Sequence, residues 1–277
     1  MSDPLARLAA RAIRATALVD TAYRRFDGLR SVLVARFASD GVLDAFNDLT
    51  YGASAVYRPD APNYRSELFH WEIEAIGRAF PAAPARVLVG GAGGGREAFA
   101  LAARGYDVVA FEPSPQLAGS MASHAAVAGR VTACIGRYED LPTLQVAAEG
   151  AGSIDLRQLP AFGAAMFGWS SYSHIRYRKA RVLALREMAA VTDGPVVVSF
   201  YLGRRPARTP QSRLQEIVRR LGLGGSLDRF TTHVGFYHLS TAEELHAEAR
   251  DAGLEVVHEC YDDLDGRWPY VVLRRRA

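Results

Sequence analysis

The feature that most constrains this chain is a run of glycines directly after a short apolar segment. Residues 86–97 read Arg-Val-Leu-Val-Gly-Gly-Ala-Gly-Gly-Gly-Arg-Glu, so five glycines fall within six residues. Glycine is needed where the backbone turns sharply or approaches a ligand closely, because a Cβ there would clash or forbid a positive φ. A helix expected over residues 95–104 would direct its free amides at the same place. The pattern predicts a strand, a ligand-binding loop and a helix.

A second apolar segment completes this unit. Residues 107–111 read Asp-Val-Val-Ala-Phe and lead into Glu112, about 20 residues past the loop. A carboxylate at the end of that strand can accept hydrogen bonds from both hydroxyls of a ribose. Strand, loop, helix, strand and acid together predict a βαβ unit that binds a nucleotide-type ligand.

Composition and charge narrow the class of protein. The 277 residues, of which 49% are hydrophobic and 23% charged, suit one large domain or one domain with an appendage. The net charge is only +3 and the basic residues are dispersed, which disfavours nucleic acid as a partner. No apolar stretch approaches the ~20 residues that span a bilayer, so we expect no membrane partner and a cytoplasmic location. Cys134 and Cys260 form neither a disulfide framework nor a recognisable zinc site, and we expect no metal.

The first 80 residues differ in pattern from the rest. Apolar residues recur at helical spacing over residues 3–37, a short helix is expected over 42–49, and residues 50–63 are expected to be loop. A further helix over 64–80 ends before Pro81. We therefore expect residues 1–80 to form a helical lid or appendage, and residues 81–277 to form the ligand-binding core, with an insertion at 203–239.

After Arg86 the pattern alternates between strand and helix, which predicts an α/β fold with a mostly parallel sheet covered on both faces. The expected helices are 95–104, 115–127, 174–191 and 242–252, with Ser173 capping the third. The last two expected strands are separated only by residues 262–269, too few for a parallel crossover, so we expect them to pair as an antiparallel hairpin. The expected strands are 87–90, 108–111, 131–135, 163–167, 196–201, 254–261 and 270–274.

Four segments of this core resemble the class I S-adenosylmethionine-dependent methyltransferases. They are the glycine loop at 91–95, Glu112 with Pro113, the segment Gly-Arg-Tyr-Glu-Asp-Leu-Pro at 136–142, and residues 165–174 around Trp169. The resemblance extends over about residues 86–274. It implies a Rossmann-like, seven-stranded sheet whose antiparallel last strand is inserted between the fifth and sixth. It also implies S-adenosylmethionine as the cofactor.

The resemblance assigns the cofactor to a defined set of residues, and two positions depart from the family pattern. Val89 stands where many members have an acid, and Glu97 or a residue from the N-terminal region is the candidate to replace it. Arg137 stands where an aspartate often contacts the adenine amino group, and an arginine cannot accept that hydrogen bond. Glu139 or backbone carbonyls are the candidates for this contact. The expected cofactor-binding residues are Gly90, Gly91, Ala92, Gly93, Glu112, Pro113, Tyr138, Glu139, Phe167 and Gly168.

Methyl transfer from a sulfonium requires chiefly in-line positioning and exclusion of water. An oxygen acceptor can use a general base, for which His174 is the candidate, with Tyr172 as an orienting hydroxyl. We expect the acceptor to contact a set of aromatic side chains, with the 203–239 insertion as the second wall of its pocket. The expected substrate-binding residues are Tyr51, Tyr57, Trp169 and Tyr237.

The predicted function is therefore S-adenosylmethionine-dependent methyl transfer to an oxygen or nitrogen nucleophile of a small molecule, in a biosynthetic pathway. Two alternatives stay open. Residues 93–98 fit a dinucleotide fingerprint with Ala98 as its last member, which is typical of NAD(P)- or FAD-dependent oxidoreductases. A non-catalytic S-adenosylmethionine-binding partner protein would show the same loop. The identity of the acceptor and the choice between monomer and homodimer are open at this stage.

Overall fold

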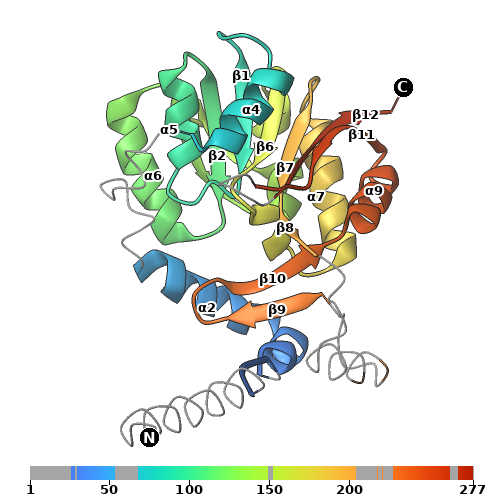
Figure 1. Cartoon of the computed structure of the whole chain (residues 1–277). Helices are drawn as coiled ribbons and strands as arrows, with labels where there is room; N and C mark the ends of the chain where they lie inside the picture. Colours follow the sequence, from blue (N-terminus) through green and yellow to red (C-terminus); the bar gives the residue numbers. More distant parts are fainter. Residues whose placement is uncertain are drawn as a thin grey trace, which may run out of the picture.

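A computed structural model of the chain describes residues 26–28, 30–53, 68–148, 152–203, 217, 220, 227–262 and 268–276. Its centre is a seven-stranded sheet (Figure 1). The strands of this sheet are β1 (Arg86–Gly90), β2 (Asp107–Glu112), β3 (Val131–Ile135), β6 (Ala164–Phe167), β7 (Val196–Ser199), β11 (Leu254–Cys260) and β12 (Tyr270–Arg275). All seven predicted strands are confirmed, each to within a few residues.

The strand order is β11-β12-β7-β6-β1-β2-β3. Strands β7, β6, β1, β2 and β3 run parallel to their neighbours in this series, whereas β12 is antiparallel to both β7 and β11. The expected antiparallel hairpin is thus confirmed, and the last strand is inserted between the fifth and sixth. The fold class is Rossmann-like α/β, as predicted.

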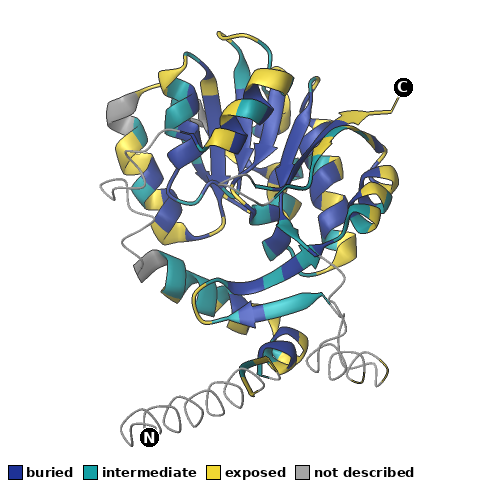
Figure 2. Cartoon of the chain, in the orientation of Figure 1, coloured by how far each residue is buried: buried dark blue, intermediate teal, exposed yellow. Residues whose placement is uncertain are grey.

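Helices cover both faces of this sheet, as the continuous burial of its strands requires. Leu88 belongs to one core cluster, with residues of α7 (Arg178–Ala190) and α9 (Ala242–Asp251). Val87 and Val89 point to the opposite cluster, which includes residues of α4 (His70–Ala79), α5 (Arg96–Ala103) and α6 (Pro115–Ala128). Figure 2 shows the buried strands between exposed outer helix faces. The apolar run of β1 therefore forms part of two cores.

A second layer lies beside the core. Strand β10 (Gly235–Ser240) pairs parallel with β8 (Tyr201–Leu202) and antiparallel with β9 (Asp228–Thr231). Helix α2 (Asp40–Ala53) packs against β10, and Ala35, Leu43, Phe230 and Phe236 form a small core of their own. Figure 1 shows α2, β9 and β10 on the side of the sheet from which β7 leads into β8. We call α2, β9 and β10 the cap layer; it faces the carboxyl ends of the parallel strands.

The structure corrects several local predictions. The helix expected from residue 174 begins at Arg178, and a 3-10 turn, η4 (Ser171–His174), precedes it. Ser173 does not cap this helix, since its hydroxyl accepts a hydrogen bond from the Tyr201 amide at 2.9 Å. The predictions also missed the hairpin of β4 (Gln145–Ala148) and β5 (Gly152–Asp155), and they described β9 and β10 only as part of an insertion.

Two further N-terminal predictions are tested in part. The short helix expected over 42–49 is present and longer, as α2. Of the helix expected over 64–80, residues 70–79 form α4, which packs in the sheet's core cluster through Trp71, Ala75 and Ile76. The region 3–37, expected to form one long or two shorter helices, lies mostly outside the described residues. None of the helices described is both long and apolar enough to cross a membrane.

A buried ion pair joins α7 to α9 beneath the sheet. The Arg181 guanidinium donates to both carboxylate oxygens of Glu248, with Nη2 to Oε1 at 2.7 Å, and the Tyr172 hydroxyl donates to the same carboxylate. The side chains of Arg181 and Glu248 are only 4% and 1% exposed. Removing one member of a buried pair leaves the other charge uncompensated, which is strongly destabilising.

We expect Arg181→Met to lower the free energy of unfolding by about 3–5 kcal/mol, because the Glu248 carboxylate would stay buried without its cation. Arg178→Met is the matched control. Arg178 sits on the same helix and also pairs with α9, through Asp251, but both side chains are about half exposed. Its loss should cost about 0–1 kcal/mol. Urea unfolding measures both values, and equal effects of the two substitutions would contradict the role of the buried pair.

Candidate functional site

The glycine loop after β1 has the backbone that its sequence predicted. Gly91, Gly93 and Gly95 have φ values of 61°, 57° and 97°, a region that side chains with a Cβ rarely adopt. The Ala92 amide donates to the Phe111 carbonyl at 3.1 Å, and the Gly95 amide donates to the Ala92 carbonyl at 2.8 Å. Helix α5 begins directly afterwards. The loop is thus a tight, defined turn between β1 and α5.

The end of β6 is packed directly on this loop. The Gly168 amide donates to the Gly90 carbonyl at 2.7 Å. A Cβ added to Gly168 would lie 2.3 Å from the Gly91 carbonyl oxygen, closer than two such atoms can approach. Gly168 is therefore required by contact between two backbones, and it fixes the β6 end beside the loop.

Glu112 ends β2 and contacts the same loop. Its side chain Oε2 accepts a hydrogen bond from the Gly93 amide at 2.8 Å, and Oε1 accepts one from the Ser114 amide at 3.1 Å. Burial raises the pKa of Glu112 to about 7, because the charged form loses its hydration. Each carboxylate oxygen has further acceptor capacity, so this group can hold two donors of a ligand beside the loop.

Tyr138 fills the space next to Gly90. Its ring stacks on Phe167 with centroids 4.6 Å apart, and its hydroxyl lies 2.7 Å from the Ser171 hydroxyl. A Cβ on Gly90 would lie 2.6 Å from the Tyr138 ring. A side chain at position 90 would therefore clash, because the rings of Tyr138 and Phe111 occupy that space. Burial raises the pKa of Tyr138 well above its ordinary value, so the hydroxyl is neutral.

The remaining predicted cofactor residues lie around this turn with different exposure. Ala92 is buried within the loop. Pro113 follows Glu112, and Glu139 lies in the 3-10 turn η2 (Tyr138–Thr143) after β3; both are exposed. The structure thus brings the ends of β1, β2, β3 and β6 to one edge of the sheet, as the sequence predicted.

Arg137, which departs from the family pattern, and Glu97, a candidate to replace the acid missing at Val89, both have partners in the structure. Arg137 forms an ion pair with Asp44 of α2, with Nη2 to Oδ2 at 2.7 Å. Glu97 is buried, and its Oε1 accepts hydrogen bonds from the Trp169 amide at 3.0 Å and from Arg96 at 2.9 Å. Arg137 thus attaches the cap layer to the sheet edge, whereas Glu97 fixes the backbone beyond β6. Sequence reasoning missed Asp44 because no local pattern relates it to Arg137.

His174 lies where η4 meets the cap layer. Its Nδ1 is 2.7 Å from the Phe236 carbonyl oxygen, and since a carbonyl only accepts, Nδ1 must carry a proton. Burial lowers the pKa of His174, which favours the neutral ring. In that tautomer Nε2 has a lone pair, and it makes no hydrogen bond to the described residues. His174 therefore has the form that a general base needs.

The structure separates the other predicted catalytic residue from this position. Tyr172 is fully buried in the sheet's core cluster, and its hydroxyl is bonded to Glu248. Of the predicted substrate residues, Tyr51 contacts the His174 ring edge-on with centroids 6.0 Å apart, and Tyr237 lies 5.0 Å from Tyr201. Trp169 is 42% exposed beside the loop. Tyr57 lies outside the described residues.

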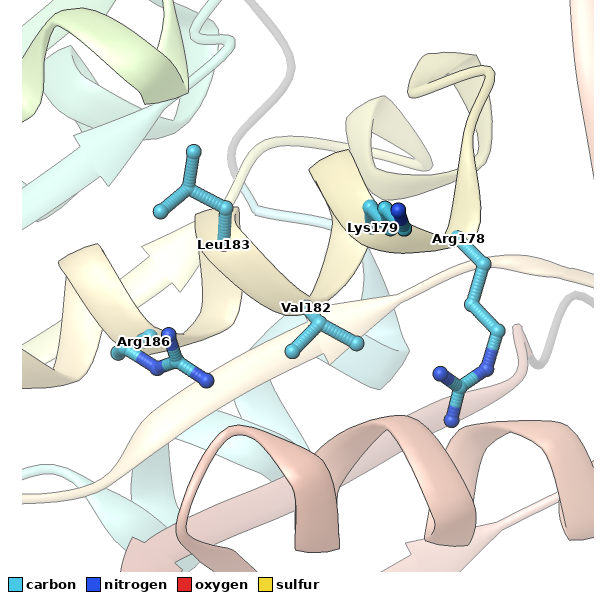
Figure 3. Close-up of a pocket in the computed structure, with 5 residues that line it drawn as sticks. All are labelled: Arg178, Lys179, Val182, Leu183 and Arg186. Atoms are coloured by element: carbon cyan, nitrogen blue, oxygen red, sulfur yellow. The ribbon is translucent and has the colours of Figure 1, made fainter.

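A surface depression of about 340 Å³ runs along α7, lined by Arg178, Lys179, Val182, Leu183 and Arg186 (Figure 3). Arg178 pairs with the Asp251 carboxylate, and Arg186 donates to the Asp251 carbonyl at 3.0 Å. This depression shares no residue with the glycine loop or with Glu112, so we do not assign it to the candidate site.

Comparison with known proteins is informative about the fold. The sequence matches no family model and no curated protein sequence. The structure is similar to that of the CcbJ methyltransferase from Streptomyces caelestis, at 18% identity and a TM-score of 0.55, over 82% of this chain and 98% of that one. It is also similar to a Rhodobacter sphaeroides protein provisionally assigned as a Zn-dependent alcohol dehydrogenase, at 14% identity and a TM-score of 0.54, over 76% and 92% of the two chains. At these identities the likeness shows a shared Rossmann-like fold.

We expect Gly168→Ala to displace the glycine loop and to lower the free energy of unfolding by about 1–3 kcal/mol, because its Cβ would meet backbone atoms. Gly119→Ala is the control. Gly119 lies within α6 with open space around its Cβ position, so this change should stabilise the protein by up to about 1 kcal/mol. Thermal unfolding distinguishes the two, and an unchanged melting temperature for Gly168→Ala would show that the contact is not required.

Proposed function

We propose that this protein is an enzyme that transfers a methyl group from S-adenosylmethionine to an oxygen or nitrogen of a small molecule, as a step of a biosynthetic pathway. The observation that carries the proposal is the Glu112 carboxylate, held against the amide of the glycine loop. A buried acid with remaining acceptor capacity, next to a loop with positive φ values, suits a ligand that offers a ribose diol.

The ligand would use the chain's residues in a consistent way. The ribose hydroxyls would donate to Glu112, while the part of the ligand next to the ribose would lie along the loop at residues 90–93. Pro113 and Tyr138, after β2 and β3, would supply surfaces for the adenine, and Glu139 of η2 is our candidate acceptor for the adenine amino group. Gly168, at the end of β6, would border the reacting methyl, whereas Phe167 would not contact it, because its ring is fully buried and stacked on Tyr138.

Strand topology favours this cofactor over a dinucleotide. Classic dinucleotide-binding sheets have the order 3-2-1-4-5-6 and are mostly parallel. Here β12 is antiparallel and lies between β7 and β11, an arrangement that the resemblance to class I methyltransferases implies. The fold is shared with CcbJ, which is named a methyltransferase, and also with the protein assigned as an alcohol dehydrogenase, so the strand topology carries this choice. A non-catalytic binding protein would bind the cofactor without turnover, and a turnover assay separates that alternative.

The parts outside the sheet would select the acceptor. We propose that residues 1–80 act as a lid, although α4 within them packs on the core, and that the 203–239 insertion forms the second wall. Two contacts support this arrangement. Arg137 pairs with Asp44 of α2, and the Tyr51 hydroxyl donates to the Val234 carbonyl at 2.6 Å, so the N-terminal region and the insertion meet at the site.

The chemistry requires little of the protein. When bound, S-adenosylmethionine supplies an electrophilic methyl on a sulfonium. The chain orients the acceptor, excludes water and, for a hydroxyl acceptor, removes its proton. We assign that last step to His174, whose ring is held by the Phe236 carbonyl. Tyr172 positions η4 through its hydrogen bond to Glu248, and its buried hydroxyl would not face the acceptor.

We expect the affinity for S-adenosylmethionine to rise as pH increases from 6 to 8. The ribose hydroxyls donate to the ionised carboxylate, and at pH 6, one unit below the Glu112 pKa of about 7, only about a tenth of it is ionised. Calorimetric titration at pH 6, 7 and 8 should show a change of up to roughly tenfold.

Glu112→Gln is the control for this titration. The amide keeps the shape of the side chain but has no charge to titrate, so binding should weaken and lose this pH dependence. Glu72, whose pKa is also raised to about 7, is still present in this variant, so any pH dependence caused by Glu72 would persist. If the pH dependence persisted in Glu112→Gln, another group would be responsible and the assignment to Glu112 would fail.

A further inference from the structure

A buried histidine lies where the cap layer meets α9. His238 belongs to β10, and its side chain is only 9% exposed. Its Nδ1 is 2.7 Å from Oδ1 of Asp228, which stands directly opposite in the β9–β10 register. Its Nε2 is 3.5 Å from Oε2 of Glu244. The ring therefore lies between a carboxylate of the cap layer and a carboxylate of α9.

The two carboxylates determine which form of this ring fits. An ionised carboxylate only accepts hydrogen bonds, so the short contact with Asp228 places a proton on Nδ1. In a neutral ring the lone pair of Nε2 would then face the Glu244 carboxylate, which is unfavourable in a buried place. Nε2 is itself buried and makes no hydrogen bond to the described residues. A second proton on Nε2 turns this atom into a donor beside Glu244, so the geometry favours the imidazolium.

Charged groups of three elements act on this ring. Asp228 of β9 and Glu244 of α9 favour its cationic form, whereas Arg181 of α7, which is paired with Glu248, opposes it. Burial lowers the pKa of His238, but the two carboxylates outweigh burial and raise the pKa above its ordinary value. The other elements packed against β10 are β8, η4 and α2. No titratable group of their described residues lies within hydrogen-bond or ion-pair distance of His238.

Glu244 also connects this charge to the first turn of α9. Its Oε2 accepts a hydrogen bond from the Thr241 amide at 3.1 Å, and the Thr241 hydroxyl accepts one from the Glu244 amide at 3.2 Å. This reciprocal pair caps the helix. A cationic His238 is compatible with Oε2 in its capping position, whereas a neutral ring opposes a lone pair to it. Loss of the proton therefore weakens the contact between β10 and α9 together with the helix cap.

The position of β10 also sets the position of the His174 ring. The Phe236 carbonyl that binds this ring lies two residues before His238 on the same strand. Helix α9 is in turn fixed to α7 by the buried pair of Arg181 and Glu248. A contact that fixes β10 against α9 thereby fixes the carbonyl to which His174 is bound.

We infer that His238 is a positioning residue: as a cation between Asp228 and Glu244 it holds β10 against α9, and loss of its proton loosens β9, β10 and the His174 ring bound to them. The folded chain binds this proton more tightly than the unfolded chain does. The stabilisation is therefore complete below the ordinary histidine pKa of about 6.5 and is lost as the pH rises through the midpoint of folded His238. The consequence for catalysis rests on the proposed function, in which His174 is the base.

NMR titration of the histidine rings in the full chain, without ligand, tests the charge of His238. Its signal is the one that is missing in His238→Gln. We expect its midpoint to lie above that of histidine in the urea-unfolded chain. Glu244→Gln should lower this midpoint, because an amide replaces one of the two carboxylates, while glutamine still serves the helix cap.

Glu259→Gln is the matched control for this titration. The Glu259 carboxylate also pairs with a histidine, His246, at 2.7 Å, but both side chains are exposed. Its loss should leave the His238 midpoint unchanged. A His238 midpoint at or below that of the unfolded chain, or one that Glu244→Gln does not lower, would overturn the inference.

Hydrogen exchange tests the positioning. After correction for the intrinsic effect of pH, protection of the amides of residues 228–240 should fall roughly threefold or more between pH 6 and pH 8.5, whereas protection of the β2 amides should not change. The Nδ1 proton of His174 should lose protection over the same range. In His238→Gln, protection of residues 228–240 should not depend on pH, and in Glu244→Gln its fall should move to lower pH. Protection that stays constant with pH in the unsubstituted chain would overturn the inference.

These measurements use neither S-adenosylmethionine nor an acceptor, so their outcome is separate from that of the proposed function. If S-adenosylmethionine failed to bind, the proposed function would fail and the pH-sensitive contact of β10 with α9 would stand. If β10 were insensitive to pH, this inference would fail and the cofactor site would stand.

Discussion

The hydrogen bond from the Gly93 amide to the Glu112 carboxylate is the contact on which the candidate site depends. It joins the end of β2 to the loop that follows β1, at 2.8 Å, and it holds a carboxylate in a buried place where its charge is unfavourable. The packing of Gly168 on the Gly90 and Gly91 carbonyls adds the end of β6 to the same unit. The ends of three strands are thereby fixed around one carboxylate. In the proposed function, the positions of the cofactor, the acceptor and the base are all set relative to that carboxylate.

The cap layer relates to this unit through a few polar contacts. Arg137 pairs with Asp44 of α2, and Arg176 donates to Asp40 of α2 and to the Ala35 carbonyl. On the other side of the site, the Phe236 carbonyl holds the His174 ring. These contacts bring the N-terminal region and the 203–239 insertion, which are far apart in sequence, to the carboxyl edge of the sheet. The rings of Trp169, Trp268 and Tyr201 lie at the same edge, each in contact with the next.

The features that depend on local pattern could be predicted from the sequence. The seven strands, the glycine conformations and the antiparallel hairpin follow from periodicity, from the needs of positive φ and from the short 262–269 connection. The features that could not be predicted are those that depend on contacts between residues far apart in sequence. Ser173 has the residue type of a helix cap, yet its hydroxyl meets the Tyr201 amide, which no sequence pattern near Ser173 reveals. Tyr172 lies close in sequence to the end of β6, where the methyl is expected to react. Its side chain nevertheless points into the core, toward Glu248. The Trp268 contact with Ser170 is likewise invisible in the sequence, because 98 residues separate the two.

The most direct test of the central claim is a calorimetric titration of the full chain with S-adenosylmethionine and, separately, with NAD, NADP and FAD. If Glu112 and the glycine loop hold S-adenosylmethionine, that ligand alone should bind saturably, with one site per chain. Saturable binding of a dinucleotide without binding of S-adenosylmethionine would contradict the account and assign the same loop to an oxidoreductase.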